Sequence, residues 1–220
     1  MEREPPAPRG GGPPGLPGGR AEIRPRRRHT ARYVARVIFE PLVIGADRDL
    51  PAPLLTELTA LHASNREFHA LSGEFPDPDD IRAEQVAAAL ADELAQPGAE
   101  VLLARSEGRL VAVAITLARH PDPAEPDPWI GLLMVSGAEQ GKGYGRRVVT
   151  EVEERFRAAG RRAVSLAVLE GNTRALAFWT ALGYEVVDHR TDRALDRPCA
   201  VLRKVLRTPT GPAGAPEGQV

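Results

Sequence analysis

Residues 135–147, VSGAEQGKGYGRR, carry the strongest structural signal in this chain. They join an apolar segment, WIGLLMV at 129–135, to a helical pattern that begins near residue 146. The three closely spaced glycines 141, 143 and 145 let the backbone turn tightly and approach a ligand. The N–H groups in the first turn of the helix form a natural anion site. We call residues 135–147 the glycine loop, and its pattern predicts phosphate binding between a strand and a helix.

Two common nucleotide-binding motifs do not fit the glycine loop. A P-loop requires GxxxxGK followed by Ser or Thr. Gly137 precedes Gly141-Lys142 by one residue too few, and Gly143 stands where the hydroxyl side chain belongs. A dinucleotide fingerprint, GxGxxG, fails because its third glycine position after Gly141 is Arg146. The pattern that remains is Gln-x-x-Gly-x-Gly, beginning at residue 140.

The rest of the chain alternates between strand and helix patterns. Apolar residues recur at helical spacing over 52–71, 79–95 and 146–159. Asp79 or Asp80 is expected to cap the second of these helices, and Asn172 to cap a further short helix that Gly183 ends. Strand patterns cover 32–44, 101–104, 109–117, 129–135, 163–169, 184–189 and 199–206. The order β-α-α-β-β-β-α-β-α-β-β predicts an α/β (α+β) fold with a mixed sheet and helices on both faces.

Composition narrows the class of protein. The 220 residues include 29 Lys and Arg and 30 Asp and Glu, so a nearly neutral chain is not expected to bind nucleic acid as its main task. The single cysteine excludes an internal disulfide and a cysteine-based zinc site, and Cys199 is expected to be a buried structural residue. No apolar run is long enough to span a membrane, and the N-terminus lacks the apolar core of a secretory signal. We therefore expect a cytoplasmic globular protein that does not act at a membrane.

The two ends differ in composition from the middle. Residues 1–30 are rich in Pro, Gly and Arg, and residues 208–220 are again rich in Pro and Gly, so we expect both to be disordered tails. The Arg-rich segment 24–28 favours a solvated arm over a nucleic-acid contact. Residues 31–207 are then expected to form one domain.

The glycine loop and a second segment together resemble a known family. The pattern that begins at Gln140 resembles the pyrophosphate loop of the GNAT superfamily of acyl-CoA-dependent N-acetyltransferases, and NTRALAFWTALGY at 172–184 resembles its second motif. The resemblance covers about 31–207. It implies a GNAT-like fold with a mostly antiparallel sheet of six to seven strands, splayed where CoA binds, and about four helices. It also implies acetyl-CoA as the acyl donor and no metal.

The resemblance carries over to individual residues. Main-chain groups of Leu133 and Val135 would pair with the pantetheine arm of CoA, the amides of 141–146 would surround the pyrophosphate, and Asn172 would hold the arm. Lys142, Arg146 and Arg147 remain alternatives for the 3′-phosphate. The implied cofactor-binding residues are Leu133, Met134, Val135, Gln140, Gly141, Lys142, Gly143, Tyr144, Gly145, Arg146, Asn172, Phe178 and Trp179. From the residues alone, Asn172 also serves as an N-cap, Phe178 as a core residue and Tyr144 as an anchor in the core.

The sequence offers candidates for the general base but no candidate for the general acid. The family pattern places a tyrosine seven residues after Asn172, where this chain has Trp179, and an indole is no acid at neutral pH. The general acid is therefore unassigned, and Tyr184, the nearest phenol, is expected to be a packing residue. Asp127 and Glu74 are the candidate bases.

The function that follows is transfer of an acetyl group from acetyl-CoA to a primary amine by direct attack in a ternary complex. A small cationic amine is favoured because acidic residues crowd the loops expected near the acceptor. These residues are Glu67, Glu74, Asp77, Asp79, Asp80, Asp122, Glu125 and Asp127. A protein N-terminus or lysine is an alternative acceptor, and a non-catalytic acyl-CoA-binding module is the alternative function. The protein is expected to be a monomer or a homodimer.

Overall fold

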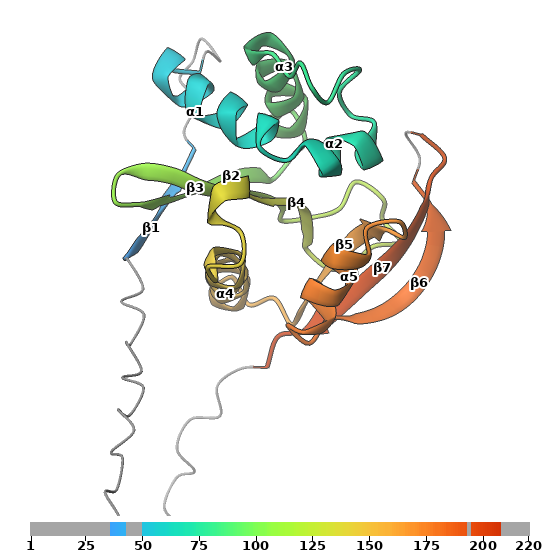
Figure 1. The fold of residues 1–220 in the computed structure, drawn as a ribbon. Coiled ribbons are helices and arrows are strands. Elements are labelled where there is room, and N and C mark those ends of the chain that lie inside the picture. The colour runs from blue at the N-terminus through green and yellow to red at the C-terminus, as the bar shows by residue number, and fades with distance from the viewer. Residues whose placement is uncertain (1–35, 43–49, 193–194, 208–220) are drawn as a thin grey trace, which may run out of the picture. The chain divides into compact units, whose positions relative to one another are not determined.

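The computed structural model describes residues 36–42, 50–192 and 195–207 (Figure 1). The tails predicted at 1–30 and 208–220 lie outside the described residues. The described elements, in chain order, are β1 (Val37–Pro41), α1 (Ala52–Ala63), α2 (Arg66–Ser72), α3 (Ala83–Leu94), β2 (Ala99–Ser106), β3 (Arg109–Leu117), β4 (Trp129–Val135), the 3₁₀ turn η1 (Gly137–Glu139), α4 (Tyr144–Ala158), β5 (Ala163–Leu169), α5 (Thr173–Thr180), β6 (Glu185–Thr191) and β7 (Pro198–Val205).

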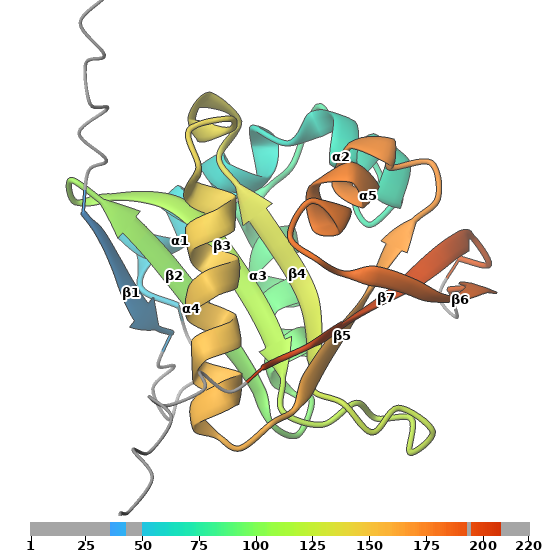
Figure 2. The same cartoon turned by 90° about the horizontal axis from the view of Figure 1, so that it is seen from below.

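The described strands form a seven-stranded sheet in the order β1-β2-β3-β4-β5-β7-β6. Neighbouring strands run antiparallel except for β4 and β5, which are parallel. Figures 1 and 2 show α1, α2 and α3 on one face of the sheet and α4 on the opposite face. The predicted mixed, mostly antiparallel sheet with helices on both faces is confirmed.

The residues of the central strand β3 show that the sheet is covered on both faces. Its residues are almost all buried, as expected for a strand between two layers of helices. Ala112 and Ala114 belong to the core beneath α4, whereas Val113 and Ile115 belong to the core beneath α1 and α3. The small alanines on one face and the larger branched side chains on the other follow the period-two alternation of a strand.

The helix predicted over 52–71 is two helices, and that prediction was wrong. The break falls at Ser64 and Asn65, whose short polar side chains bond to the main chain instead of leaving it helical. Ser64 Oγ donates to Leu61 O at 2.7 Å, and Asn65 Nδ2 donates to the same oxygen at 2.9 Å. The structure therefore has one helix more than the sequence predicted on this face.

The predicted start of the next helix was also wrong. α3 begins after Arg82 rather than at Asp79 or Asp80, and Gln85 Oε1 accepts a hydrogen bond from the Arg82 N–H at 2.8 Å. Asp79 lies in a preceding turn, where its own N–H donates to Asp77 Oδ1 at 2.8 Å. An Asp at such a turn competes with the helix for hydrogen bonds.

The remaining boundaries agree closely. β4 and β5 have the predicted bounds. α5 begins after its predicted cap Asn172 but ends at Thr180, before the predicted end at Gly183, and β6 and β7 differ from prediction by one or two residues. Of the predicted strand 32–44, β1 occupies Val37–Pro41, while residues 32–35 and 43–44 lie outside the described residues. No helix in the described ranges is both long enough and apolar enough to cross a bilayer.

Candidate functional site

The parallel strands β4 and β5 part soon after they meet. Their paired positions are Trp129 with Ser165 and Ile130 with Leu166, and the pairing ends there. The next residue, Gly131, is a bulge in the pairing of β4 with β3, where the register shifts by one residue. Figure 2 shows the two strands diverging from this point, with α5 beside the wider end of the gap.

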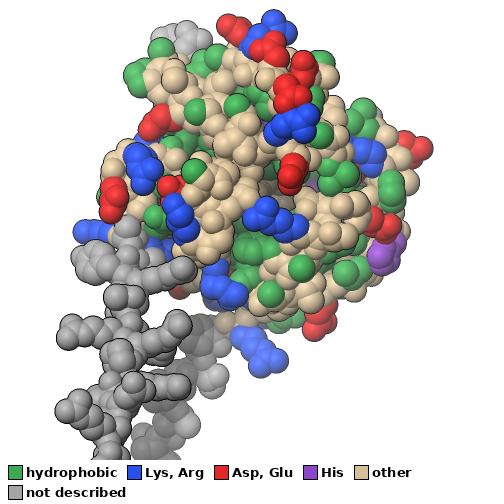
Figure 3. Space-filling model, in the orientation of Figure 1, with side chains coloured by type: hydrophobic (Ala, Val, Ile, Leu, Met, Phe, Trp, Pro, Cys, Tyr) green, Lys and Arg blue, Asp and Glu red, His purple; other side chains and the backbone are tan. Residues whose placement is uncertain are grey.

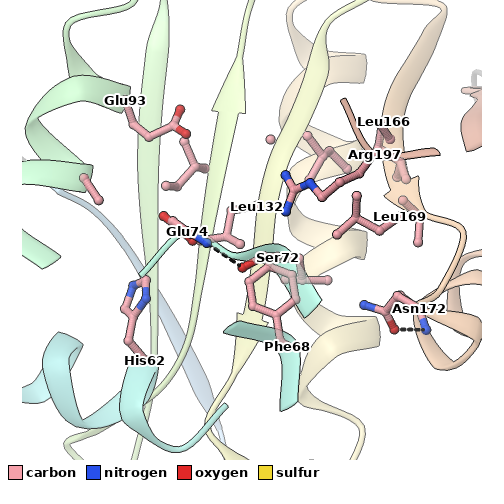
Figure 4. A pocket seen from close by; sticks show the side chains of 18 of the residues that line it. His62, Phe68, Ser72, Glu74, Glu93, Leu132, Leu166, Leu169, Asn172 and Arg197 are labelled. Atoms are coloured by element: carbon pink, nitrogen blue, oxygen red, sulfur yellow. Dashed lines mark hydrogen bonds between the residues drawn. The ribbon is translucent and has the colours of Figure 1, made fainter. Parts of the chain in front are cut away.

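A cavity of about 430 Å³ lies where the strands part. Its walls are residues 130–133 of β4 and 166–169 of β5, together with side chains of α1, α2, α3, α5 and the connection between β6 and β7. Figure 4 shows Phe68, Glu74, Glu93, Arg197 and Asn172 around this space. The volume falls in the range typical of small-molecule sites.

The edge of β4 that faces the gap exposes main-chain groups. The Ser136 N–H donates to Val111 O at 2.9 Å. Because bonding alternates along an antiparallel pair, this bond shows that the even-numbered residues of this part of β4 are the ones that bond to β3. Residues 133 and 135 then turn their main-chain groups away from β3, toward the β5 side. The Val135 carbonyl already accepts from Asn65 Nδ2 at 3.1 Å and from Gln140 Nε2 at 3.3 Å. Leu133 is therefore the better placed of the two predicted residues to pair with a pantetheine amide.

The glycine loop ends in an uncapped helix N-terminus. Gly141 and Gly143 have φ of 75° and 91°, a left-handed conformation that favours glycine. The Arg147 N–H donates to Gly143 O at 3.3 Å, which leaves the amides of 144–146 without an acceptor inside α4. Within the described residues no side chain caps this end, and a Cβ added at Gly141 or Gly143 would meet nothing within 4 Å. The loop thus combines free donors with open space, which fits a phosphate group.

Hydrogen bonds from both side chains and the main chain anchor the glycine loop to the rest of the protein. Gln140 Nε2 donates to Asn65 Oδ1 at 2.8 Å, and the Gly137 N–H donates to Ser64 Oγ at 2.9 Å. The hydroxyl of Tyr144 is buried and donates to Ser106 Oγ at 3.1 Å. The break between α1 and α2 therefore fixes the loop, and Tyr144 is the anchor in the core that the sequence predicted.

The basic residues of the loop differ in their surroundings. Lys142 Nζ lies 3.0 Å from Glu139 Oε2, and Glu139 also pairs with Arg109. These two cations lower the pKa of the Glu139 carboxyl, with the Lys142 hydrogen bond as the main cause. Arg146 is exposed on the first turn of α4. The Lys142 side chain is thus held at the loop, while Arg146 extends into solvent.

The second motif lies at the same gap. Asn172 Oδ1 accepts from the Ala175 N–H at 3.0 Å, and Figure 4 shows the amide nitrogen of Asn172 pointing into the cavity. Trp179 is buried and lines the cavity, with its ring centroid 5.2 Å from that of Phe178. Asn172 can therefore cap α5 and donate to a ligand at the same time.

Tyr184 lies outside the cavity. It is 1% exposed, its hydroxyl donates to Glu153 Oε1 at 3.3 Å, and burial raises the pKa of the phenol well above its ordinary value. A phenol held in this way is a packing residue, as the sequence predicted. Cys199 is also buried, and burial raises the pKa of its thiol.

The two candidate bases lie in different places. Glu74 lines the cavity, and its pKa is raised by burial and next by the charge of Glu93, against a smaller opposing effect of Arg197. Asp127 precedes β4 at the closed end of the gap, is not among the cavity residues, and accepts from Arg203 Nε at 2.7 Å. Of the two candidates, Glu74 is therefore the one that lines the cavity.

Three of the other acidic residues that the sequence placed near an acceptor have cationic partners outside the cavity. Asp79 pairs with Arg66, Asp80 with Arg82 and Glu125 with Arg190. Of the whole predicted acidic set, Glu74 is the member that lines the cavity. The acidic character of these loops therefore does not by itself select the acceptor.

Three cavity residues carry no local sequence signal. Glu93 comes from α3, His62 from α1 and Arg197 from the β6–β7 connection, and none of them belongs to either motif. Burial raises the pKa of Glu93 and lowers that of His62 to about 4. The described residues contain no cluster of three or more His, Cys, Asp or Glu that could hold a metal ion.

Known proteins resemble this chain in sequence and in fold. The sequence matches the acetyltransferase (GNAT) family over residues 62–184. An acetyltransferase from Thermus thermophilus has a similar structure, with 24% sequence identity, a TM-score of 0.57, and coverage of 79% of this chain and 99% of that one. No curated protein matches the sequence.

Two further solved structures share the fold at lower identity. The ribosomal-protein-S18-alanine N-acetyltransferase of Escherichia coli is 15% identical, with a TM-score of 0.55 and coverage of 79% and 96% of the two chains. A GNAT family acetyltransferase from Elizabethkingia anophelis with acetyl-CoA bound is 14% identical, with a TM-score of 0.53 and coverage of 77% and 98%. At these identities the likeness shows the fold.

Proposed function

Because the chain belongs to the GNAT acetyltransferase family, we propose that it transfers an acetyl group from acetyl-CoA to the primary amine of a small molecule. The observation that carries the proposal is the gap between β4 and β5, which opens beside the uncapped N-terminus of α4 and leads into a cavity lined by the carboxylate of Glu74. Donor binding, acceptor binding and proton removal are thus available at one place.

The donor would be held by residues that already fit its parts. The amides of 144–146 face the end of the glycine loop, where they can donate to the pyrophosphate of CoA. Leu133 main-chain groups and the Asn172 amide line the gap along which the pantetheine arm would run. Acetyl-CoA supplies the activated thioester. The indole of Trp179 gives this end of the cavity an apolar wall.

The acceptor must lose a proton before it can attack. Two carboxylates in the cavity, Glu74 and Glu93, attract an amine in its ammonium form, and the raised pKa of Glu74 makes that carboxylate a more effective base near neutral pH. The gap-facing N–H groups of β4 are available to polarise the thioester carbonyl. An acceptor that arrives as an ammonium first gives one proton to Glu74, which passes it on to water. The neutral amine then attacks, the C–N bond forms and the C–S bond breaks. The second N–H proton leaves by way of Glu74 and water and reaches the CoA thiolate, so the net products are the acetylated amine, CoA thiol and one proton.

The test is a panel of primary amines with acetyl-CoA, followed by release of free thiol and by mass spectrometry of the acetylated product. Amine-dependent thiol release with a matching acetyl-amine supports the proposal. Binding of acetyl-CoA without release for any amine, including peptide N-termini and lysine peptides, would support the alternative of a non-catalytic acyl-CoA-binding module. The absence of a tyrosine at residue 179 keeps that alternative worth testing.

A further inference from the structure

The cavity carries opposite charges on its two sides. Glu74, just after α2, and Glu93, on α3, lie on one side, and Arg197 from the β6–β7 connection lies on the other (Figure 4). Among the described residues, Arg197 forms no ion pair with Glu74 or with Glu93. A ligand between them would therefore meet carboxylates at one end and a guanidinium at the other.

The Arg197 guanidinium is held in place, but not all of its hydrogen-bond donors have an acceptor among the described residues. Its Nε donates to Asp192 Oδ2 at 2.6 Å, which fixes the side chain. Its Nη1 nitrogen is buried and has no hydrogen-bond partner among the described residues. Figure 4 shows the guanidinium pointing across the cavity toward Glu74 and Glu93. A buried donor without a partner is costly, and the Arg197 side chain lines the cavity, so a ligand that brings an acceptor to this guanidinium would bind with a gain in stability.

The chemistry of the guanidinium indicates which ligand group fits. A planar guanidinium with free N–H groups matches the two oxygens of a carboxylate. A purely cationic amine would satisfy Glu74 and Glu93 but would leave the Nη1 nitrogen of Arg197 without an acceptor and would bring a like charge close to it. The surrounding surface does not separate the two kinds of acceptor, because Lys and Arg are interspersed with Asp and Glu on the face in Figure 3.

We propose that the acceptor is a small zwitterion of the amino-acid type, which carries a carboxylate that binds Arg197 and an amine that binds Glu74. Acetylation of that amine rests on the function proposed above, whereas recognition of the carboxylate does not. The cavity volume of about 430 Å³ leaves room for a small acceptor beside the thioester end of the donor.

The experiment compares amino acids with the amines that lack their carboxylate. The pairs are L-lysine with cadaverine, L-phenylalanine with phenethylamine, and L-leucine with isopentylamine. Each compound is titrated calorimetrically into the full chain saturated with CoA, and each is assayed for acetylation with acetyl-CoA. For at least one pair we expect the carboxylate to improve both affinity and kcat/KM by about tenfold or more, since a site built around a polar group rejects ligands that lack it.

Variants assign this preference to Arg197. Arg197→Gln should reduce the ratio within the preferred pair to near one, and Arg197→Lys should restore part of it. Arg190→Gln is the matched control, because Arg190 lies on β6, pairs with Glu125 and is not a cavity residue. It should leave the ratio unchanged.

The outcomes separate the two proposals. Equal or better performance of the decarboxylated amines in every pair overturns the zwitterion and leaves the acetyltransferase function standing. An unchanged preference in Arg197→Gln also overturns the assignment. Carboxylate-dependent binding without thiol release supports the zwitterion and contradicts the proposed function.

Discussion

Phe178 of α5 lies against Gly145 of α4 so closely that a Cβ atom on residue 145 would come within 3.2 Å of the aromatic ring. The contact joins the two sequence motifs, which are separated by helix α4 and strand β5. The glycine is required here by the close approach of a side chain, whereas Gly143 is required by its backbone conformation. The same contact brings the N-terminus of α4 next to the helix that carries Asn172 and Trp179.

Gly145→Ala should therefore disturb both motifs. The added methyl group must push Phe178 aside, and we expect a loss of about 1–3 kcal/mol in the free energy of unfolding. Phe178→Leu in the same chain should recover part of that loss, because the smaller side chain makes room. Urea denaturation of the two single variants and the double variant measures this coupling. Strict additivity of the two effects would mean that the contact is not the cause.

Gly143→Ala tests the phosphate-binding role of the glycine loop. A Cβ at a φ of 91° is strained, at a cost of about 1–2 kcal/mol, so reduced stability alone proves nothing about CoA. Gly160→Ala is the matched control, since Gly160 has a φ of 73°, also meets nothing within 4 Å, and lies at the far end of α4. Calorimetry should show weaker CoA binding for Gly143→Ala alone. A similar loss in both variants would contradict the assignment.

The sequence predicted the parts of the site that have local signatures. The glycine loop and the Asn172 cap depend on backbone conformation and on near neighbours, so their patterns survive in a single sequence. Glu93, His62 and Arg197 reach the cavity from three distant elements, and the type of each residue is ordinary on a protein surface. Only the folded sheet, with β4 and β5 parted, brings them together.

For the acidic loops, the sequence placed residues near the site that the structure does not bring to the cavity. Asp127 is a plausible base by sequence because it stands just before β4, but its partner Arg203 lies 76 residues later on β7. A count of carboxylates along the chain cannot show which of them meet an arginine in the fold. The break between α1 and α2 has a distant partner as well as its local one, since Asn65 bonds to Leu61 of α1 and also to Val135 of β4.

The pH profile of acetylation should report on Glu74. Its raised pKa means that the active carboxylate form is lost as the pH falls through a value above the ordinary 4.5. Glu74→Gln should lower kcat by about 100-fold or more if this group removes the amine proton. Glu93→Gln should move the acid limb to lower pH, since it removes the neighbouring negative charge that raises the pKa of Glu74.

Arg197→Gln should move the same limb in the opposite direction, because the charge of Arg197 lowers the pKa of Glu74. Glu67→Gln is the control, since Glu67 is exposed on α2 and is not a cavity residue. Its profile should coincide with that of the parent chain. Identical acid limbs for all four variants would exclude Glu74 as the titrating group.

Acid stability should depend on the stacked pair His62 and His69. Both are buried, their ring centroids are 5.3 Å apart, and burial lowers both pKa values to about 4. Between pH 6.5 and 4 the unfolded chain takes up protons that the folded protein does not, so stability falls as the pH falls, by up to about 1.4 kcal/mol per pH unit for each histidine.

His69→Leu places an apolar side chain of similar size against Phe75 and removes one of the two titrating groups. Its free energy of unfolding should fall less steeply between pH 6.5 and 4 than that of the parent chain. His189→Asn changes an exposed histidine outside this cluster and serves as the control. Equal slopes for His69→Leu and the parent chain would show that His69 takes up its proton in the folded state.

Trp179 separates the shape of the site from its chemistry. The indole is 6% exposed, lines the cavity and has its ring centroid 4.9 Å from that of Tyr184, so it forms a fixed wall beside the gap. Trp179→Phe keeps an aromatic wall and removes the N–H, and should cost less than about 1 kcal/mol of transition-state stabilisation. Trp179→Ala opens a cavity and misplaces the thioester, and should cost clearly more.

The alkaline limb of the pH profile should persist in Trp179→Phe, because an indole is no acid. A fall of about 100-fold in Trp179→Phe with unchanged CoA affinity would instead show that the indole N–H contacts the reacting group.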